Sequence, residues 1–166
     1  MLSNSFQPIL IVATLFVALT AGLLFAFAIV VMPGTKQLND AEFIRSFQVM
    51  DGVIQSNQPI FMLVWVGSAV TLILAAVFGF GQAEPLQRMI LIGAVALYFV
   101  GVQAPTVAIN IPLNNEIQTV QVESLDRAEQ REARAKFEDR WNRANRFRTA
   151  VAVAVTLLLL LLLLLL

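Results

Sequence analysis

The chain has 166 residues, of which 58% are hydrophobic and 13% are charged. Soluble domains carry roughly 25% charged residues, so this composition, with a mean hydropathy of +0.78, predicts a chain whose solvent is lipid. Cysteine and histidine are both absent, which excludes disulfides, thiolate nucleophiles, Cys/His zinc sites and haem bound through either residue. We therefore expect no metal and no cofactor.

Four uncharged apolar runs predict four membrane-spanning helices. They cover about residues 9–32, 59–80, 89–109 and 149–166. Each comes close to or exceeds the roughly 20 residues that cross a hydrocarbon core about 30 Å thick. Within the first run, Ala26-Phe27-Ala28 resembles a signal-peptide cleavage site, but Met1–Gln7 lacks Lys and Arg. We expect this run to remain as a span that ends at Pro33-Gly34.

The two long connections, about residues 39–56 and 113–148, are also predicted to be helical. In the first, Asn39 and Glu42 have the spacing of a capping box. Helical periodicity then separates an apolar face from a polar face. The apolar face holds Phe43, Phe47, Met50 and Ile54, and the polar face holds Gln48, Asp51 and Gln55. In the second connection, acid-before-base pairs four residues apart favour a helix. They are Glu123/Arg127, Glu132/Lys136 and Asp139/Arg143.

These elements predict an all-α fold, a four-transmembrane-helix bundle in a single membrane domain (1–166), with amphipathic helical extensions on one side. Lys36, Arg45 and the eight basic residues of 127–148 lie on that side, whereas the opposite connection holds only Arg88. The positive-inside rule therefore predicts a multi-pass protein of the cell (inner) membrane, with both long loops in the cytoplasm and both termini outside.

The arginine-rich stretch before the last span is interleaved with acidic residues, so its net charge is close to neutral. This pattern argues against a nucleic-acid partner and favours a solvated helix beside the headgroups of the lipid bilayer. The sequence leaves the oligomeric state open.

Two ladders of small residues predict that the first two spans pack against each other, because close approach of helices in lipid requires small side chains. The ladders are Thr14, Ala18, Gly22 and Ala26, and Gly67, Thr71, Ala75 and Gly79.

The third span carries a polar stripe of Gln103, Thr106 and Asn110, beside Pro105 and Pro112. The two prolines interrupt helical hydrogen bonding. Because unpaired amides are costly in lipid, the stripe is expected to face the bundle interior.

We expect the polar groups of the third span, the first loop and the last helix to meet at one mouth of the bundle. One hypothesis is that they bind a small aromatic or lipophilic ligand, and the alternative is that they only bond to one another and lock the bundle. The candidate ligand-binding residues are Gln48, Gln55, Gln103, Thr106, Asn110, Asn114, Arg140, Trp141, Asn145 and Arg148. Asp51 is the candidate general base, or else forms an ion pair with Arg140 or Arg148.

Two segments, Asn110-Ile-Pro-Leu-Asn114 and Trp141-Asn-Arg-Ala-Asn-Arg-Phe-Arg148-Thr149, carry a family resemblance. With Val31-Met32-Pro33-Gly34 and Gln55–Phe61, they resemble the anthrone oxygenase-like family of largely bacterial four-helix membrane proteins. The resemblance covers nearly the whole chain. It implies a four-helix bundle and, through fungal relatives, oxygenation of anthrones to anthraquinones without metal or flavin. Many relatives carry a histidine near the final Arg-Thr and a tryptophan before it, where this chain has Arg146 and Ala144.

Three classes of function remain. The first is a membrane protein that binds a lipophilic ligand or a membrane partner without catalysis. The second is a cofactor-free oxygenase acting on an anthrone-type molecule. The third is a small-molecule transporter, although the spans lack the ionisable residues that commonly couple transport to ions.

Overall fold

A computed structural model describes residues 5–166, and every regular element in that part of the chain is a helix. Four helical units are long and apolar enough to cross a membrane. They are Phe6–Thr35, Pro59–Gly79, Pro85–Gln118 and Arg127–Leu164. The predicted all-α, four-helix fold class is therefore confirmed, and the protein is a multi-pass membrane protein.

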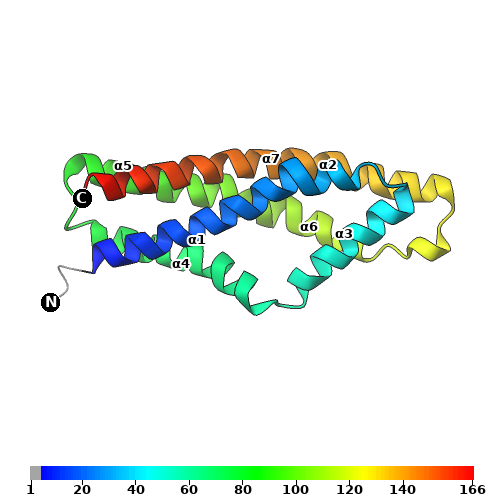
Figure 1. The fold of residues 1–166 in the computed structure, drawn as a ribbon, viewed down its shortest axis with the longest axis horizontal. Helices are drawn as coiled ribbons and strands as arrows, with labels where there is room; N and C mark the ends of the chain where they lie inside the picture. The colour runs from blue at the N-terminus through cyan, green and yellow to red at the C-terminus, as the bar shows by residue number, and fades with distance from the viewer. Residues whose placement is uncertain (1–4) are drawn as a thin grey trace.

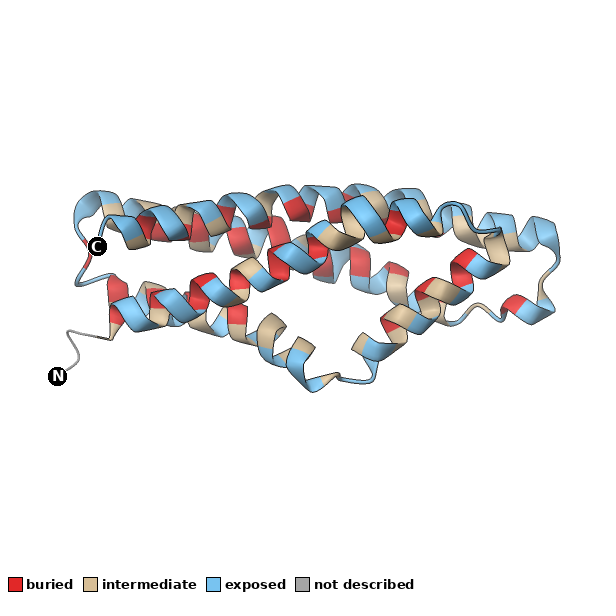
Figure 2. Cartoon of the chain, in the orientation of Figure 1, coloured by how far each residue is buried: buried red, intermediate tan, exposed pale blue. Residues whose placement is uncertain are grey.

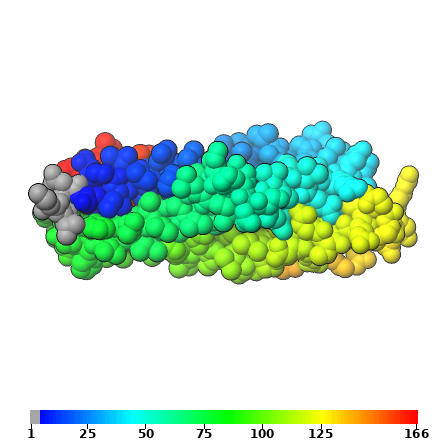
Figure 3. Space-filling view, turned by 90° about the horizontal axis from the view of Figure 1, so that it is seen from below, coloured from blue at the N-terminus to red at the C-terminus, as the bar shows by residue number. Residues whose placement is uncertain are grey.

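The four long units lie along one another in an elongated bundle (Figures 1 and 3). In chain order the elements are α1 (Phe6–Ala26), η1 (Phe27–Val31), α2 (Met32–Thr35), α3 (Asp40–Gln55), α4 (Pro59–Gly79), α5 (Pro85–Tyr98), η2 (Phe99–Gln103), η3 (Thr106–Asn110), α6 (Ile111–Gln118), η4 (Val122–Ser124) and α7 (Arg127–Leu164). The start of α1 and the end of α7 lie at the same end of the bundle (Figure 1). At the other end α3, α6 and residues 127–148 of α7 pack together, and we call these three segments the extension.

Helix α3 begins at the predicted capping box. The Asn39 side chain accepts from the Glu42 backbone N–H at 2.9 Å, and the Glu42 carboxylate accepts from the Asn39 N–H at 3.3 Å. The buried residues of α3 are Phe43, Ile44, Phe47 and Asp51. The prediction that Asp51 lies on a different face from Phe47 is wrong, because a step of four residues returns to nearly the same side of a helix.

Helices α1 and α4 pack against each other as predicted, but through different residues on α1. A Cβ built on Gly67 would lie 2.7 Å from the Phe16 ring, and one built on Gly79 would meet the Phe6 ring. The small residues of α4 therefore receive aromatic side chains of α1. The predicted ladder on α1 is wrong at Gly22, which is exposed with nothing near its missing side chain, whereas Thr14 is buried.

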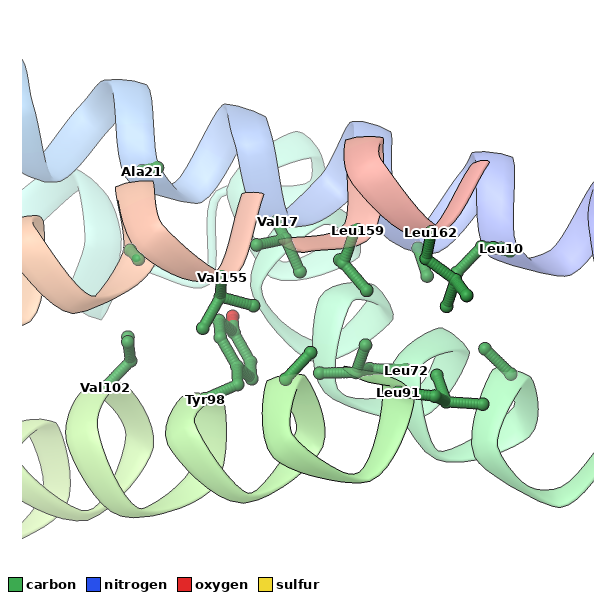
Figure 4. Close-up of a cluster of buried hydrophobic side chains, with 14 of the residues drawn as sticks. Leu10, Val17, Ala21, Leu72, Leu91, Tyr98, Val102, Val155, Leu159 and Leu162 are labelled. Atoms are coloured by element: carbon green, nitrogen blue, oxygen red, sulfur yellow. The ribbon is translucent and has the colours of Figure 1, made fainter. Parts of the chain in front are cut away.

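Aliphatic side chains fill the bundle between α1, α4, α5 and α7, where they point toward one another (Figure 4). Figure 2 shows the same arrangement as buried residues on the inward faces and exposed residues on the outer ones. One polar group among them is the hydroxyl of Tyr98, which is fully buried and lies 2.5 Å from Ser68 Oγ. Gln103 also donates to the Tyr98 hydroxyl, at 3.3 Å.

Three π-helical turns carry the chain past prolines that would otherwise break the helices. The turns η1, η2 and η3 each end two residues before a proline, namely Pro33, Pro105 and Pro112. A proline ring clashes with the carbonyl four residues earlier in an α-helix, and in each case that carbonyl belongs to the π turn. The wider turn relieves the clash, so the first helical unit continues past Pro33 to Thr35 and the third runs on to Gln118.

Ion pairing in the extension differs from the sequence pattern. Glu132 and Lys136 form the predicted pair at 2.8 Å. Glu123 instead lies in η4, before α7 begins, and pairs with Arg45 of α3. Asp139 and Arg143 form no ion pair within residues 5–166. The predicted pair Glu123/Arg127 is therefore wrong, because helix α7 starts only at its cap, Asp126. The predicted pair Asp139/Arg143 is also wrong, although both residues lie within α7.

Candidate functional site

A cavity of about 260 Å³ lies where the membrane bundle meets the extension. Its walls come from α1, η1, α3, α4, η3, α6 and α7. The lining residues are Leu23, Leu24, Phe27, Phe47, Asp51, Ile54, Phe61, Met62, Trp65, Thr106, Asn110, Ile111, Asn114, Trp141, Asn145 and Arg148. Ligand sites typically enclose about 300–1,000 Å³ with mostly apolar walls and a few polar groups, and this cavity is close to that pattern.

Five aromatic rings form the apolar walls, in two groups. On one side, Trp141 packs against Phe27 at 5.8 Å and against Phe47 at 5.4 Å between ring centroids. On the other side, Phe61 and Trp65 lie stacked on successive turns of α4, with centroids 6.1 Å apart. Both tryptophans of the chain therefore line the cavity.

Asp51 is buried at the end of the cavity that lies in the extension, and its carboxylate is held by amides. It accepts from Gln55 at 2.7 Å, from Asn114 at 2.6 Å and from Gln118 at 2.9 Å. No ion pair to Asp51 forms within residues 5–166. The expected ion pair with Arg140 or Arg148 is thus wrong, because side-chain amides of α3 and α6 surround the carboxylate instead.

Asn114 connects Asp51 to the aromatic wall. Its amide nitrogen donates to Asp51, while its oxygen accepts from the Trp141 indole N–H at 2.8 Å. The two bonds fix the orientation of the amide. Asn114 therefore positions both a carboxylate and an indole ring at the cavity surface.

Gln118 and Gln48 join α3 to α6 behind this wall. Gln118 donates to Asp51 and also to the Gln48 carbonyl, at 3.0 Å. Gln48 donates to the carbonyls of Ile117 and Val120, at 2.8 and 2.9 Å. The sequence analysis missed Gln118, although Asn110, Asn114 and Gln118 recur every four residues and so continue the polar stripe along one helix face.

Arg148, the last residue of the extension, lies on the cavity wall formed by α7 and η3. Its side chain donates to Thr106 Oγ1 at 2.7 Å and to Asn145 Oδ1 at 2.9 Å. The residue is only 4% exposed, and its Nε atom has no hydrogen-bond partner. No ion pair to Arg148 forms within residues 5–166.

Asn110, which also lines the cavity, has a second unsatisfied atom. Its amide nitrogen donates to the Trp141 carbonyl at 3.4 Å, whereas its Oδ1 atom is buried without a partner. Among residues 5–166, four buried side-chain nitrogen or oxygen atoms lack partners, and two of them belong to cavity residues Asn110 and Arg148. Buried polar groups in native proteins are generally bonded, so Asn110 and Arg148 are two exceptions among the residues that line this cavity.

The structure brings together six of the ten predicted ligand-binding residues. Thr106, Asn110, Asn114, Trp141, Asn145 and Arg148 line the cavity. The other four lie outside it. Gln48 bonds to α6, Gln55 touches Asp51 from an exposed position, Gln103 turns to Tyr98, and Arg140 is exposed. Thr106 and Asn110 face the bundle interior, as predicted for the polar stripe.

The sequence model of the anthrone oxygenase family matches residues 55–158, which is 104 of the 166 residues. The chain belongs to the anthrone oxygenase family. The matched part of this family member includes Asn110 and Arg148, whereas Asp51 lies before it. No curated protein and no solved structure matches the chain.

The two positions at which the family resemblance leads us to expect a histidine and a tryptophan lie outside the cavity lining. Arg146 is exposed on α7, and Ala144 is buried. Asp51 and Arg148 are the two ionisable residues among those that line the cavity.

Proposed function

We propose that this membrane protein binds a small, largely aromatic molecule in the cavity between the bundle and the extension. The observation that carries the proposal is a cavity with aromatic walls whose lining includes Arg148 and Asn110, two buried residues that each have a polar atom without a partner, Nε and Oδ1. A ligand oxygen would accept from Arg148, and a ligand hydroxyl or N–H would donate to Asn110. Aromatic rings of the ligand would pack on Trp65 and Trp141.

The alternative, in which the polar groups only lock the bundle, describes one part of the site well. Asp51, Asn114 and Gln118 satisfy one another and tie α3 to α6. The same account leaves Arg148 Nε and Asn110 Oδ1 without partners. Mutual hydrogen bonding therefore explains the polar groups around Asp51, and ligand binding explains those of Arg148 and Asn110.

Fluorescence provides a direct test of binding, because both tryptophans line the cavity. Titration of the purified protein with anthrone is expected to quench tryptophan emission to saturation. Asn110→Leu removes the amide and narrows the cavity. It should raise the anthrone concentration needed for half-maximal quenching by about tenfold, a loss of affinity typical of one buried polar contact. Asn115→Leu is the matched control, because Asn115 is exposed and does not line the cavity. Quenching that is equal in all three proteins would place the ligand elsewhere.

A second candidate function is oxygenation of an anthrone, favoured by the family match and by the carboxylate and guanidinium that line one cavity. In that reaction the methylene carbon of anthrone loses two hydrogens, one oxygen atom of O₂ becomes the new carbonyl, and the other leaves as water. Asp51 would take the first proton, and Arg148 would donate to the oxygen on which negative charge develops.

Turnover distinguishes binding from oxygenation. Purified protein is incubated with anthrone under air, and anthraquinone formation and oxygen uptake are followed together. Oxygenation predicts turnover that falls in Asp51→Asn and in Asn110→Ala but persists in Asn115→Ala. Saturable quenching without anthraquinone formation would instead support binding alone.

We also propose that the extension lies in the cytoplasm of the cell (inner) membrane and that both termini lie outside. The support is the concentration of basic residues in the connections around α3 and the start of α7, against Arg88 on the opposite side. Because the chain has no cysteine, single-cysteine variants can report the topology. A membrane-impermeant maleimide applied to intact cells should label Gly81→Cys but not Ser124→Cys, and the reverse result would invert the topology.

A further inference from the structure

We propose that the ligand of this cavity is an anion, a planar aromatic molecule whose single negatively charged oxygen group pairs with Arg148. The inference rests on the proposed function, since it takes the cavity to be a ligand site. The inference adds the charge of the ligand, the orientation of the ligand in the cavity, and the residue that binds the charged group.

The first argument is that Arg148 lacks a counter-ion where one is most needed. A buried charge is stable only when it is paired or fully hydrogen-bonded. Arg148 lines the cavity and is 4% exposed; it donates to Thr106 and Asn145 and lies 6.0 Å from the centre of the Trp141 ring, and these three partners are uncharged. The guanidinium has further N–H donors, among them Nε, which is buried without a partner.

Other arginines of the extension show the contrast. Arg134 bonds to Asp40 at 3.1 Å and to Glu138 at 2.7 Å, and it also donates to the carbonyls of Lys36 and Leu38. Arg45 pairs with Glu123. Both are more exposed than Arg148, and both have carboxylates. The more deeply buried arginine is the one left for a partner from outside the chain.

The second argument is that the neutral partners of Arg148 are themselves held in place. Thr106 donates its hydroxyl to the Val102 carbonyl at 2.6 Å, so its oxygen is left to accept from Arg148. Asn145 donates to the Leu24 carbonyl at 3.1 Å, which turns its Oδ1 toward the guanidinium. The guanidinium is therefore fixed before a ligand arrives, as expected of a prepared anion receptor.

The third argument concerns the direction in which the ligand binds. Asp51 is the other ionisable residue among those lining the cavity, and its oxygens already accept from three amides. It would repel a second negative charge, so the anionic group lies at Arg148 and an uncharged part of the ligand faces Asp51. One cation in the lining matches one negative group, which an aryl carboxylate or a phenolate provides.

The test compares two probes that share one ring system. They are 9-anthracenecarboxylate, which is anionic at pH 7.5, and 9-anthracenemethanol, which is neutral. Binding is measured by energy transfer from tryptophan to anthracene in the purified protein. We expect the carboxylate to bind about tenfold more tightly than the alcohol, since a charge-assisted pair is roughly twice as strong as a neutral hydrogen bond.

Variants assign that preference to Arg148. Arg148→Gln should abolish this preference by lowering the affinity for the carboxylate to about that for the alcohol, and Arg148→Lys should retain part of the preference because the charge remains. Arg143→Gln is the matched control, because Arg143 is exposed on the same helix and does not line the cavity. Arg143→Gln should prefer the carboxylate over the alcohol as strongly as the wild type does.

Each outcome bears on a different part of the proposal. Equal affinity for both probes in the wild type, or a preference that survives Arg148→Gln, would overturn the anionic ligand and leave the cavity as a binding site. Failure of both probes to bind would overturn the proposed function as well. If Arg148→Gln does not fold, the wild-type ratio and Arg148→Lys still decide, because a wild type without preference is sufficient to reject the inference.

Discussion

The two ends of this bundle are stabilised in different ways. At the end where α1 begins and α7 finishes, aliphatic side chains pack against one another (Figure 4). Glycines of α4 there receive phenylalanine rings of α1. In the extension, aromatic rings and side-chain amides hold α3, α6 and α7 together around a cavity. Lipid offers no hydrophobic drive for helix association. The first end must therefore rely on shape, whereas the extension relies on hydrogen bonds and can leave space for a ligand.

Asp51→Ala is the most severe test of the hydrogen-bonded end. It removes the acceptor shared by Gln55, Asn114 and Gln118 and leaves the half-buried amide nitrogen of Asn114 without a partner, whereas Gln118 keeps its bond to the Gln48 carbonyl. We expect a loss of about 3 kcal/mol in the free energy of unfolding, since each unsatisfied buried donor costs about 1–3 kcal/mol. Thermal unfolding in detergent measures the change.

Asp139→Ala is the control for that experiment. Asp139 is exposed on α7 and forms no ion pair within residues 5–166, so its loss should change stability by about 0.5 kcal/mol or less. Equal effects of the two substitutions would show that the amides around Asp51 do not hold the extension.

Glycine-to-alanine changes on the third helical unit test the dependence on shape at the other end. A Cβ on Gly101 would lie 2.7 Å from Val151 Cγ1, on a β-branched side chain that has little freedom to move. We expect Gly101→Ala to destabilise the bundle by about 1–3 kcal/mol, the usual cost of overpacking. The matched variant Gly93→Ala meets nothing within 4 Å and should stabilise by about 0.5–1 kcal/mol through helix propensity. Changes of the same sign in both variants would contradict packing by shape.

The sequence was sufficient for the fold because span length and charge placement are local properties. Apolar runs of membrane-crossing length gave the four helices, and the Asn39–Glu42 spacing gave the start of α3. The face that a helix turns toward its neighbour, in contrast, depends on residues far away in the sequence. Gly22 and Gly67 both belong to small-residue ladders, yet only Gly67 contacts the neighbouring helix. The difference comes from Phe16, whose ring occupies the space that Gly67 leaves.

The candidate site was predicted in part for the same reason. Polar residues spaced along one face of the third span pointed to Thr106 and Asn110, which line the cavity. The partner of Asp51 was mistaken because electrostatic attraction was expected to select an arginine, whereas α6 places amides closer. The unsatisfied atoms on Arg148 and Asn110 result from three-dimensional packing around the π turns, which sequence spacing does not express.

The smallest effect is expected at Tyr98, where the shape-packed end contains a hydrogen-bonded group of its own. Tyr98→Phe keeps the ring among the aliphatic side chains and removes only the hydroxyl that meets Ser68 and Gln103. Ser68 retains its bond to the Trp65 carbonyl at 2.7 Å, and Gln103 is only half-buried. Interhelical hydrogen bonds in membranes contribute on average about 0.6 kcal/mol, so the unfolding midpoint should fall only slightly. A loss comparable to that of Asp51→Ala would mean that hydrogen bonds govern both ends, and the distinction between packing by shape and packing by polar contacts would fail.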